Sequence, residues 1–381
     1  MNQAAASGTG PWPGMDPLEA VRVIRGELGA PHLSFLPELP QRGVGADAVG
    51  RTAAVLTELP VDVQPYGWRL VAAPGRELRR AVSLLNTDIN ALADVMGAEE
   101  TTGGSLKIQL RGPLSLAANL YLHHGERALS DHGARRDILQ SFSLGMADHI
   151  AKIREISRGA DVVVQFDEPE IGRVLAGAIP TASGYRTLRS VPEPEVLSAW
   201  RTAAEAARSA GAAEIAVNGP ASGVPVRKLD EAGMDAAGVD VHDLTMGQWE
   251  DLAGAIESGR RVWLRLTTET TPAVTSSAPE AGNAAADHRS GRRSGDDPQG
   301  EDDNGRPPYD DGRRPGEVPQ VRALASQVLE PWRRLGLPSS QLRQLLLLPA
   351  SSMADAGPLR ARRILTRLTS TAEALNQVAA E

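Results

Sequence analysis

The apolar residues of this chain gather into eight short runs, which begin near residues 6, 32, 106, 162, 214, 238, 261 and 344. Runs of this length are typical of strands, and most are separated by segments whose apolar residues recur with helical spacing. The predicted helices are 17–28, 43–56, 76–96, 114–123, 137–157, 193–210, 226–232, 246–258, 320–335 and 357–381. Strands that alternate with helices indicate a parallel sheet, and eight repeats favour closure into a barrel. The pattern therefore predicts an α/β protein with a (β/α)8 TIM barrel.

Three segments lie outside this alternation. Residues 1–7 are small or polar and are expected to form a disordered tail, although a very short first strand is counted just before Gly8. Residues 60–80 mix Pro, Gly and aromatic residues without a period and are predicted to be irregular. Residues 271–317 contain almost no large apolar side chain, so burial cannot offset their ordering entropy. We therefore expect a single barrel over residues 8–381, interrupted by a disordered insertion at 271–317.

Charge and cysteine content narrow the function classes. The chain has 381 residues and a formal net charge of -8, of which the insertion with its 10 acids and 6 arginines holds -4. No concentrated basic surface is evident, which argues against nucleic acid and membrane surfaces as partners. No cysteine is present, so disulfides, thiolate metal ligands and a cysteine nucleophile are excluded. Neither a signal peptide nor a membrane-spanning run is visible, and we expect a cytoplasmic protein.

Candidate site residues come from the ends of the predicted strands, because a barrel of this type forms its site where the strands end. The stretch 161–169, DVVVQFDEP, is a buried strand that ends in two carboxylates, Asp167 and Glu168, and Pro169 terminates it. An unpaired buried carboxylate is costly, so both acids are expected where a ligand, water or a cation can reach them. The alternative is a salt bridge or a helix N-cap at the strand end. Other strand ends contribute Glu38, Asn218 and Asp240.

The histidines have structural interpretations that compete with metal binding. His242 and Asp240 fall on one face of a predicted strand that covers residues 238–243, which favours a packed, hydrogen-bonded histidine over a metal ligand. His123 and His124 lie in or after a helix and are expected on the surface. The sequence assigns no catalytic residue.

Several of these motifs together resemble one enzyme family. The motifs are Gln165 to Pro169 at a strand end, a small-residue loop before Trp12-Pro13, Glu38 followed by Arg42, and Gly112-Pro113 after the third strand. In this order they resemble the C-terminal catalytic barrel of cobalamin-independent methionine synthase. The resemblance covers nearly the whole chain except the insertion and is to the short, single-barrel members of the family. It implies a TIM barrel of the methionine synthase and uroporphyrinogen decarboxylase type.

The resemblance also implies an activity and a metal. The family transfers a methyl group from a methyl-folate to the thiol of homocysteine, which zinc activates as a thiolate. The family's His-x-Cys pair falls on Asn218 and Pro220, its carboxylate on Asp240 or His242, and its last cysteine on Ser351. Because most of these residues are poor zinc ligands, we expect no zinc cofactor and a protein that is unable to use the family's mechanism. Whether the chain is an enzyme is left open.

The family's substrate-binding residues are better retained. The resemblance implies that Glu38 and Asp167, with Glu168 beside them, face the ammonium group of an amino acid such as homocysteine. The backbone at Gly8 and Gly10 would face its carboxylate. A methyl-folate or corrinoid donor would be a further small-molecule partner.

Two alternative functions remain open. The first is a non-catalytic barrel that binds an amino acid or another metabolite. The second is a metal-free decarboxylase of the uroporphyrinogen decarboxylase type, for which Arg42 and Arg111 are the candidate partners of substrate carboxylates.

Overall fold

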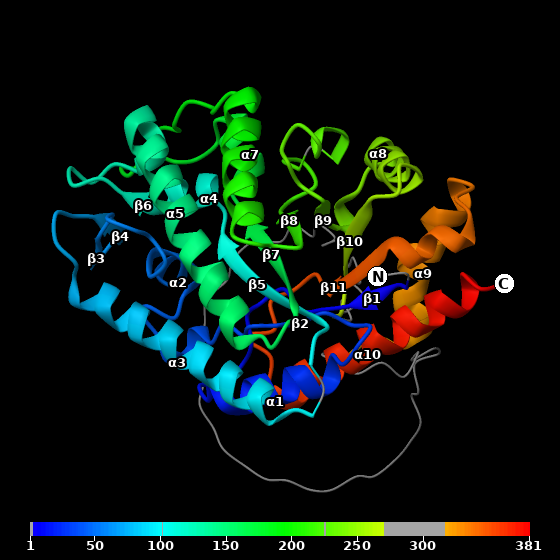
Figure 1. The fold of residues 1–381 in the computed structure, drawn as a ribbon. Coiled ribbons are helices and arrows are strands. Elements are labelled where there is room, and N and C mark those ends of the chain that lie inside the picture. The colour runs from blue at the N-terminus through cyan, green and yellow to red at the C-terminus, as the bar shows by residue number, and fades with distance from the viewer. Residues whose placement is uncertain (1–2, 101, 225, 270–316) are drawn as a thin grey trace, which may run out of the picture. The chain divides into compact units, whose positions relative to one another are not determined.

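The computed structural model describes residues 3–100, 102–224, 226–269 and 317–381. Its main feature is an eight-stranded sheet in the order β1-β11-β10-β9-β8-β7-β5-β2, in which all neighbouring strands are parallel (Figure 1). The strands are β1 Ala5–Ala6, β2 Ser34–Phe35, β5 Ser105–Arg111, β7 Asp161–Asp167, β8 Glu214–Asn218, β9 Ala236–Asp240, β10 Arg261–Leu266 and β11 Leu345–Pro349. Each of the eight predicted runs forms one of these strands, so the predicted α/β class is confirmed.

The sheet curls until its two end strands lie near each other. Strand pairing is not continued between β1 and β2, but the Leu33 N–H donates to the Ala6 carbonyl at 2.9 Å. Beyond the strands, the Glu38 N–H donates to the Gly10 carbonyl at 3.0 Å, and the Trp12 N–H donates to the Glu38 carbonyl at 2.8 Å. The fold is therefore a curled α/β sheet of the barrel type that strand pairing does not close, and backbone hydrogen bonds beside and beyond β1 and β2 bridge its two ends.

The first strand corrects the predicted tail. Ala4, Ala5 and Ala6 are fully buried, and the backbone of Ala4 exchanges two hydrogen bonds with the side chain of Asn376 at 2.7 and 2.9 Å. Asn376 lies on the last helix, which packs against β1 and β11. Residues 4–7 therefore belong to the barrel.

Helices follow most of the strands and cover the outside of the sheet (Figure 1). Local signals start several of them: Asp16 accepts from the Leu18 and Glu19 N–H groups, and Thr245 and Gln248 form a capping box. The predicted helix at 226–232 is only a 3-10 turn, Val226–Lys228, and α6 was not predicted. The helices are α1 Pro17–Glu27, α2 Ala48–Ala53, α3 Arg76–Ala98, α4 Pro113–Asn119, α5 His132–Ile156, α6 Ile171–Ala176, α7 Glu193–Ser209, α8 Met246–Glu257, α9 Val321–Arg334 and α10 Pro358–Val378.

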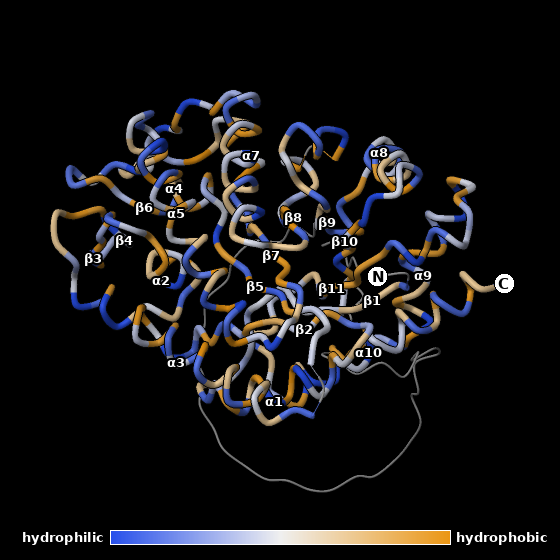
Figure 2. The backbone as a smooth tube through the Cα atoms, in the orientation of Figure 1, coloured by the Kyte–Doolittle hydropathy of each residue, from blue (hydrophilic) through white to orange (hydrophobic). Residues whose placement is uncertain are grey.

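The hydrophobic core has two parts because alternate residues of each strand face opposite sides. The larger part joins the sheet to the helices and includes Val162, Val164 and Phe166 of β7. The smaller part fills the inside of the barrel and includes Val163 of β7 and Trp263 of β10. In Figure 2 the central strands are largely orange, whereas the outer helices alternate between orange and blue. Towards the ends of the strands the inward positions become polar, and this change prepares the site.

The segment predicted to be irregular contains a hairpin. Strands β3 Val61–Gln64 and β4 Gly67–Leu70 pair antiparallel and join β6 Leu120–Tyr121 in a small second sheet. Asp62 and Arg69 are opposite each other across the hairpin, and Arg69 donates two hydrogen bonds to the Asp62 carboxylate at 2.7 and 3.1 Å. These strands have no apolar run because polar pairs of this kind occupy them. The predicted insertion lies outside the described residues, apart from Glu317.

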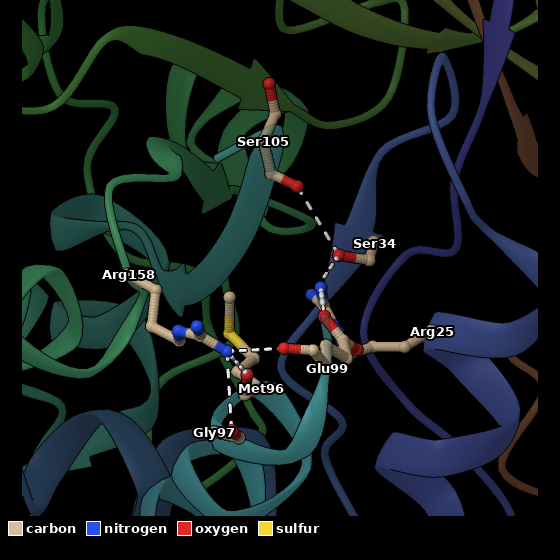
Figure 3. A network of polar contacts seen from close by, with 7 residues as sticks. All are labelled: Arg25, Ser34, Met96, Gly97, Glu99, Ser105 and Arg158. Atoms are coloured by element: carbon tan, nitrogen blue, oxygen red, sulfur yellow. Dashed lines mark hydrogen bonds and ion pairs between the residues drawn. The ribbon is translucent and has the colours of Figure 1, made fainter. Parts of the chain in front are cut away.

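A polar network ties elements together where the strands begin (Figure 3). Arg158, in the loop before β7, donates to three carbonyls at the end of α3 at 2.6, 2.8 and 3.3 Å. Arg25 of α1 forms an ion pair with Glu99, which follows α3, and donates to the Ser34 hydroxyl at 3.2 Å. These contacts stabilise the end of the barrel opposite the strand ends that form the site. None of the helices in the described part of the chain combines the length and hydropathy that a bilayer crossing requires.

Candidate functional site

A cavity of about 350 Å³ lies where the strands end. Each of the eight strands contributes a residue at or just beyond its end, as a barrel site requires. The lining residues are Thr9, Pro11, Glu38, Ala48, Arg111, Asp167, Pro169, Asn218, Gly219, Pro220, Asp240, Arg265, Ala350 and Ser352. The cavity thus brings together six residues proposed from the sequence: Glu38, Arg111, Asp167, Asn218, Pro220 and Asp240.

Glu38 is 5% exposed and lines the cavity. The backbone hydrogen bonds to Gly10 and Trp12 hold it in place. Among the described residues, no hydrogen-bond donor or cation pairs with its carboxylate. Burial raises the pKa of Glu38 and the nearby Asp167 adds to this change, whereas the positive charges of Arg51, Arg111 and Lys107 oppose it. Glu38 is therefore a carboxylate that forms no hydrogen bond or ion pair through its side chain with the described residues.

Asp167 is the last residue of β7 and is held by its neighbours on one side only. Its Oδ1 accepts hydrogen bonds from Gln165 Nε2 and from Asn218 Nδ2, both at 2.7 Å. Gln165 Nε2 also donates to the Thr9 carbonyl at 2.9 Å, and Gln165 Oε1 accepts from Lys107 Nζ at 2.7 Å. These contacts orient Asp167 and leave its Oδ2 without a partner in the described structure.

Lys107 is a buried charged residue near the site that the sequence analysis did not single out. It is completely buried inside the barrel, and its ammonium lies 5.3 Å from the centre of the Phe35 ring. Burial lowers the pKa of Lys107 to about 8, although the charges of Asp167 and Glu38 act in the opposite direction. The available signal was a lysine in the middle of a strand whose polar and apolar residues alternate, in a chain with lysine only at 107, 152 and 228.

The Lys107→Met variant is expected to lack one component of the pH dependence of stability. Folded Lys107 loses its proton at about pH 8, whereas an unfolded lysine keeps its proton up to about pH 10.4. Between these values the unfolded chain binds more protons, so the wild-type free energy of unfolding gains roughly 2–3 kcal/mol from this residue as the pH rises. Urea denaturation at pH 7 and pH 10 measures this gain. The exposed Lys152→Met is the matched control, and equal pH dependence in wild type and Lys107→Met would contradict the assignment.

Two arginines of different character line the cavity. Arg111 ends β5, and its guanidinium has no hydrogen-bond or ion-pair partner within the described ranges. Arg265 of β10 is paired: its Nη2 donates to Asp240 Oδ2 at 2.7 Å and to the Gly219 carbonyl at 2.9 Å. Arg42, the other candidate from the sequence, does not line the cavity and instead binds the buried Asp88 at 2.7 Å.

Glu168 does not face the cavity, contrary to the substrate-binding role that the resemblance implied. Its side chain is fully buried and accepts from the N–H groups of Leu114 and Ser115 at 3.1 and 2.7 Å, and from the indole N–H of Trp200 at 2.9 Å. Burial raises the pKa of Glu168, while the hydrogen bonds from Ser115 and Trp200 oppose this change. Glu168 therefore anchors the start of α4 from a distant part of the chain, and the N-cap residue of α4 is Gly112.

The glycines of the loop after β1 have steric roles. Neither Gly8 nor Gly10 lines the cavity, whereas Thr9 between them does. A Cβ on Gly8 would lie 2.5 Å from the Phe35 ring, and Gly10 has a φ of +129° with Gln109 2.7 Å from the position of a Cβ. These positions require glycine for close packing and backbone conformation.

The positions that correspond to the family's zinc ligands do not form a metal site. Asn218 and Pro220 line the cavity, but the Asn218 amide donates to Asp167 and Pro220 has no ligand atom. Ser351 does not line the cavity, whereas Ser352 does. No group of three or more His, Cys, Asp or Glu in the described part of the chain is placed to hold a metal ion. The donors present therefore do not fit a zinc ion, which needs at least three protein ligands.

The structure also corrects the prediction for His242. Strand β9 ends at Asp240, and residues Val241–Asp243 form a 3-10 turn, so alternation along the strand no longer applies. His242 is exposed and is not packed, while Asp240 is bound to Arg265. The prediction that His123 and His124 lie on the surface is confirmed.

Comparisons with known proteins leave the function open. The chain matches no protein-family model and no curated protein. Among solved structures it is similar to the carboxyl transferase domain of Rhizobium etli pyruvate carboxylase, at 12% identity and a TM-score of 0.25, over 76% of this chain and 44% of the other. The Y628A variant of that domain with pyruvate is 11% identical with a TM-score of 0.23, over 78% of this chain and 52% of the other. The domain with pyruvate and biocytin is 11% identical with a TM-score of 0.26, over 99% of this chain and 54% of the other. The chain spans about half of those structures. TM-scores this low carry no argument about function.

Proposed function

We propose that this protein binds a small zwitterionic metabolite, an α-amino acid, in the cavity at the strand ends. The observation that carries the proposal is a pair of opposite charges, Glu38 and Arg111. They come from the neighbouring strands β2 and β5, line the same cavity, and have no protein partner within the described residues. Burying an unpaired charge is costly, and a ligand with one ammonium and one carboxylate would satisfy both groups.

The surroundings of the two charges support a ligand whose ammonium contacts Glu38 and whose carboxylate contacts Arg111. Asp167 is the register partner of Arg111 across β5 and β7, and its free Oδ2 adds a second acceptor for the ammonium. The planar guanidinium of Arg111 suits a bidentate contact with the carboxylate. The cavity of about 350 Å³ is at the small end of the range of ligand pockets, roughly 300–1,000 Å³, which favours an amino acid over a tetrapyrrole.

The proposal is compatible with a barrel of the methionine synthase type, because the family resemblance also places the ammonium group of an amino acid at Glu38 and Asp167. Homocysteine and methionine are therefore among the ligands to be tested. We derive no methyl transfer, because the thiol activation of that family needs zinc ligands that Asn218, Pro220 and Ser351 do not supply. A decarboxylase of the uroporphyrinogen type is less well supported, because Arg42 is absent from the cavity and Arg265 is neutralised by Asp240.

Isothermal titration calorimetry with matched ligand sets tests the proposal. Each set contains an amino acid, the amine that lacks its carboxylate and the acid that lacks its amino group. We expect only the zwitterions to bind measurably, since loss of either charged group leaves Glu38 or Arg111 unpaired. Binding of an amine or an acid as tight as that of its parent amino acid would contradict the proposal, as would the absence of binding by every amino acid.

A further inference from the structure

The cavity has a second polar pole, the ion pair of Asp240 and Arg265, across the mouth of the barrel from Glu38 and Arg111. In the order of the strands, Glu38 and Arg111 belong to the second and third strands, and Asp240 and Arg265 belong to the sixth and seventh. In an eight-stranded barrel these pairs of strands face each other. A ligand whose head group contacts Glu38 and Arg111 therefore directs its side chain toward Asp240 and Arg265.

This second pole is electrically neutral but not fully hydrogen-bonded. Asp240 and Arg265 are register partners on β9 and β10, and they form an ion pair at 2.7 Å with side chains 22% and 13% exposed. The Nη1 of Arg265 has no hydrogen-bond partner in the described structure, and Asp240 Oδ1, Arg265 Nε and Asn218 Oδ1 are buried without one. A carboxylate oxygen accepts more than one hydrogen bond, so Asp240 Oδ2 can also take a donor from a ligand.

From this arrangement we infer that the amino acid bound here has a side chain that ends in a neutral carboxamide, as glutamine does. The inference rests on the proposed amino-acid-binding function. A carboxamide oxygen accepts from Arg265 while its NH2 donates to Asp240, which fits a paired cation and anion. A terminal carboxylate would be repelled by Asp240, and a terminal ammonium by Arg265. A thioether would leave the remaining donors and acceptors of this pair without hydrogen bonds.

Competition between four amino acids tests this inference by calorimetry on the full chain. Wild-type protein is expected to bind glutamine at least about tenfold more tightly than glutamate, lysine or methionine, since sites built for hydrogen bonds reject ligands that cannot make them. If another of the four binds as tightly as glutamine, the inference is overturned while the proposed function stands. If no amino acid binds, both fail.

The Asp240→Asn variant gives a second, independent readout. It keeps the shape of the side chain but removes the anion, so Arg265 loses its counter-charge. We expect the preference to reverse, with glutamate binding more tightly than glutamine. The matched control is Asp243→Asn, an exposed aspartate outside the cavity, which should keep the wild-type ranking. An unchanged ranking in Asp240→Asn, with the same melting temperature as wild type, would overturn the inference.

Discussion

Glu38→Gln is expected to weaken amino-acid binding by about 30-fold to 1,000-fold, because it removes one partner of a buried charge pair. The fold should not suffer. Glutamine has nearly the shape of glutamate, and the Glu38 carboxylate has no protein partner to lose in the described ranges. Burial also disfavours the ionised form of the Glu38 carboxyl, so a neutral side chain at this position avoids a desolvation cost. Calorimetry measures the affinity, and thermal unfolding monitors the fold.

Protonation of Glu38 should also make ligand affinity depend on pH. Ligand ammonium binds the ionised carboxylate, and burial raises the pKa of Glu38. As the pH falls through that raised value, which lies above the ordinary value of about 4.3, Glu38 takes up a proton and wild-type affinity should decrease. Glu38→Gln should lack this dependence. The exposed Glu205→Gln is the control and should behave as wild type; equal affinity in Glu38→Gln and Glu205→Gln would remove Glu38 from the site.

The adjacent acids Asp167 and Glu168 are expected to respond to mutation in opposite ways. Glu168→Ala should lower the free energy of unfolding by about 3–5 kcal/mol, because two backbone N–H groups and the Trp200 indole lose their buried acceptor. Asp167→Asn should abolish binding with little change in stability, since an asparagine oxygen still accepts from Gln165 and Asn218.

Urea denaturation and calorimetry on both variants separate the two roles. If Asp167→Asn unfolds readily while it retains ligand, Asp167 is structural and the proposed ammonium site is wrong. If Glu168→Ala is as stable as wild type, the hydrogen bonds that we assign to Glu168 do not stabilise the start of α4.

The alternation of strands and helices was predictable because its signals are local. Runs such as Val162 to Val164 identify strands, and caps such as Asp16 identify helix starts, without reference to distant residues. The hairpin β3-β4 was not predicted because Asp62 and Arg69 stabilise it as a cross-strand pair. That pairing forms only when the two strands meet. The end of β9 was placed too late because the chain enters the 3-10 turn Val241–Asp243 directly after Asp240.

The site was predictable only as a set of strand ends. Glu38, Asp167 and Asn218 follow or end predicted strands, and parallel strands end on the same side of a barrel. Their place in one cavity could therefore be predicted. Which of two neighbouring carboxylates faces that cavity, and which arginine remains unpaired, depends on contacts between residues far apart in the chain. Arg111 and Lys107 were therefore undervalued, and Glu168 was given the wrong role.

The sequence by itself determined the alternation of strands and helices and the acidic character of the strand ends, because periodicity and residue type act over a few residues. Only the tertiary structure decided which charges are compensated. Asp240 pairs with Arg265 and Glu168 accepts from Trp200, whereas the side chains of Glu38 and Arg111 form no ion pair or hydrogen bond in the described chain. Compensation of a charge depends on distance and burial, and these quantities exist only after the strands have come together.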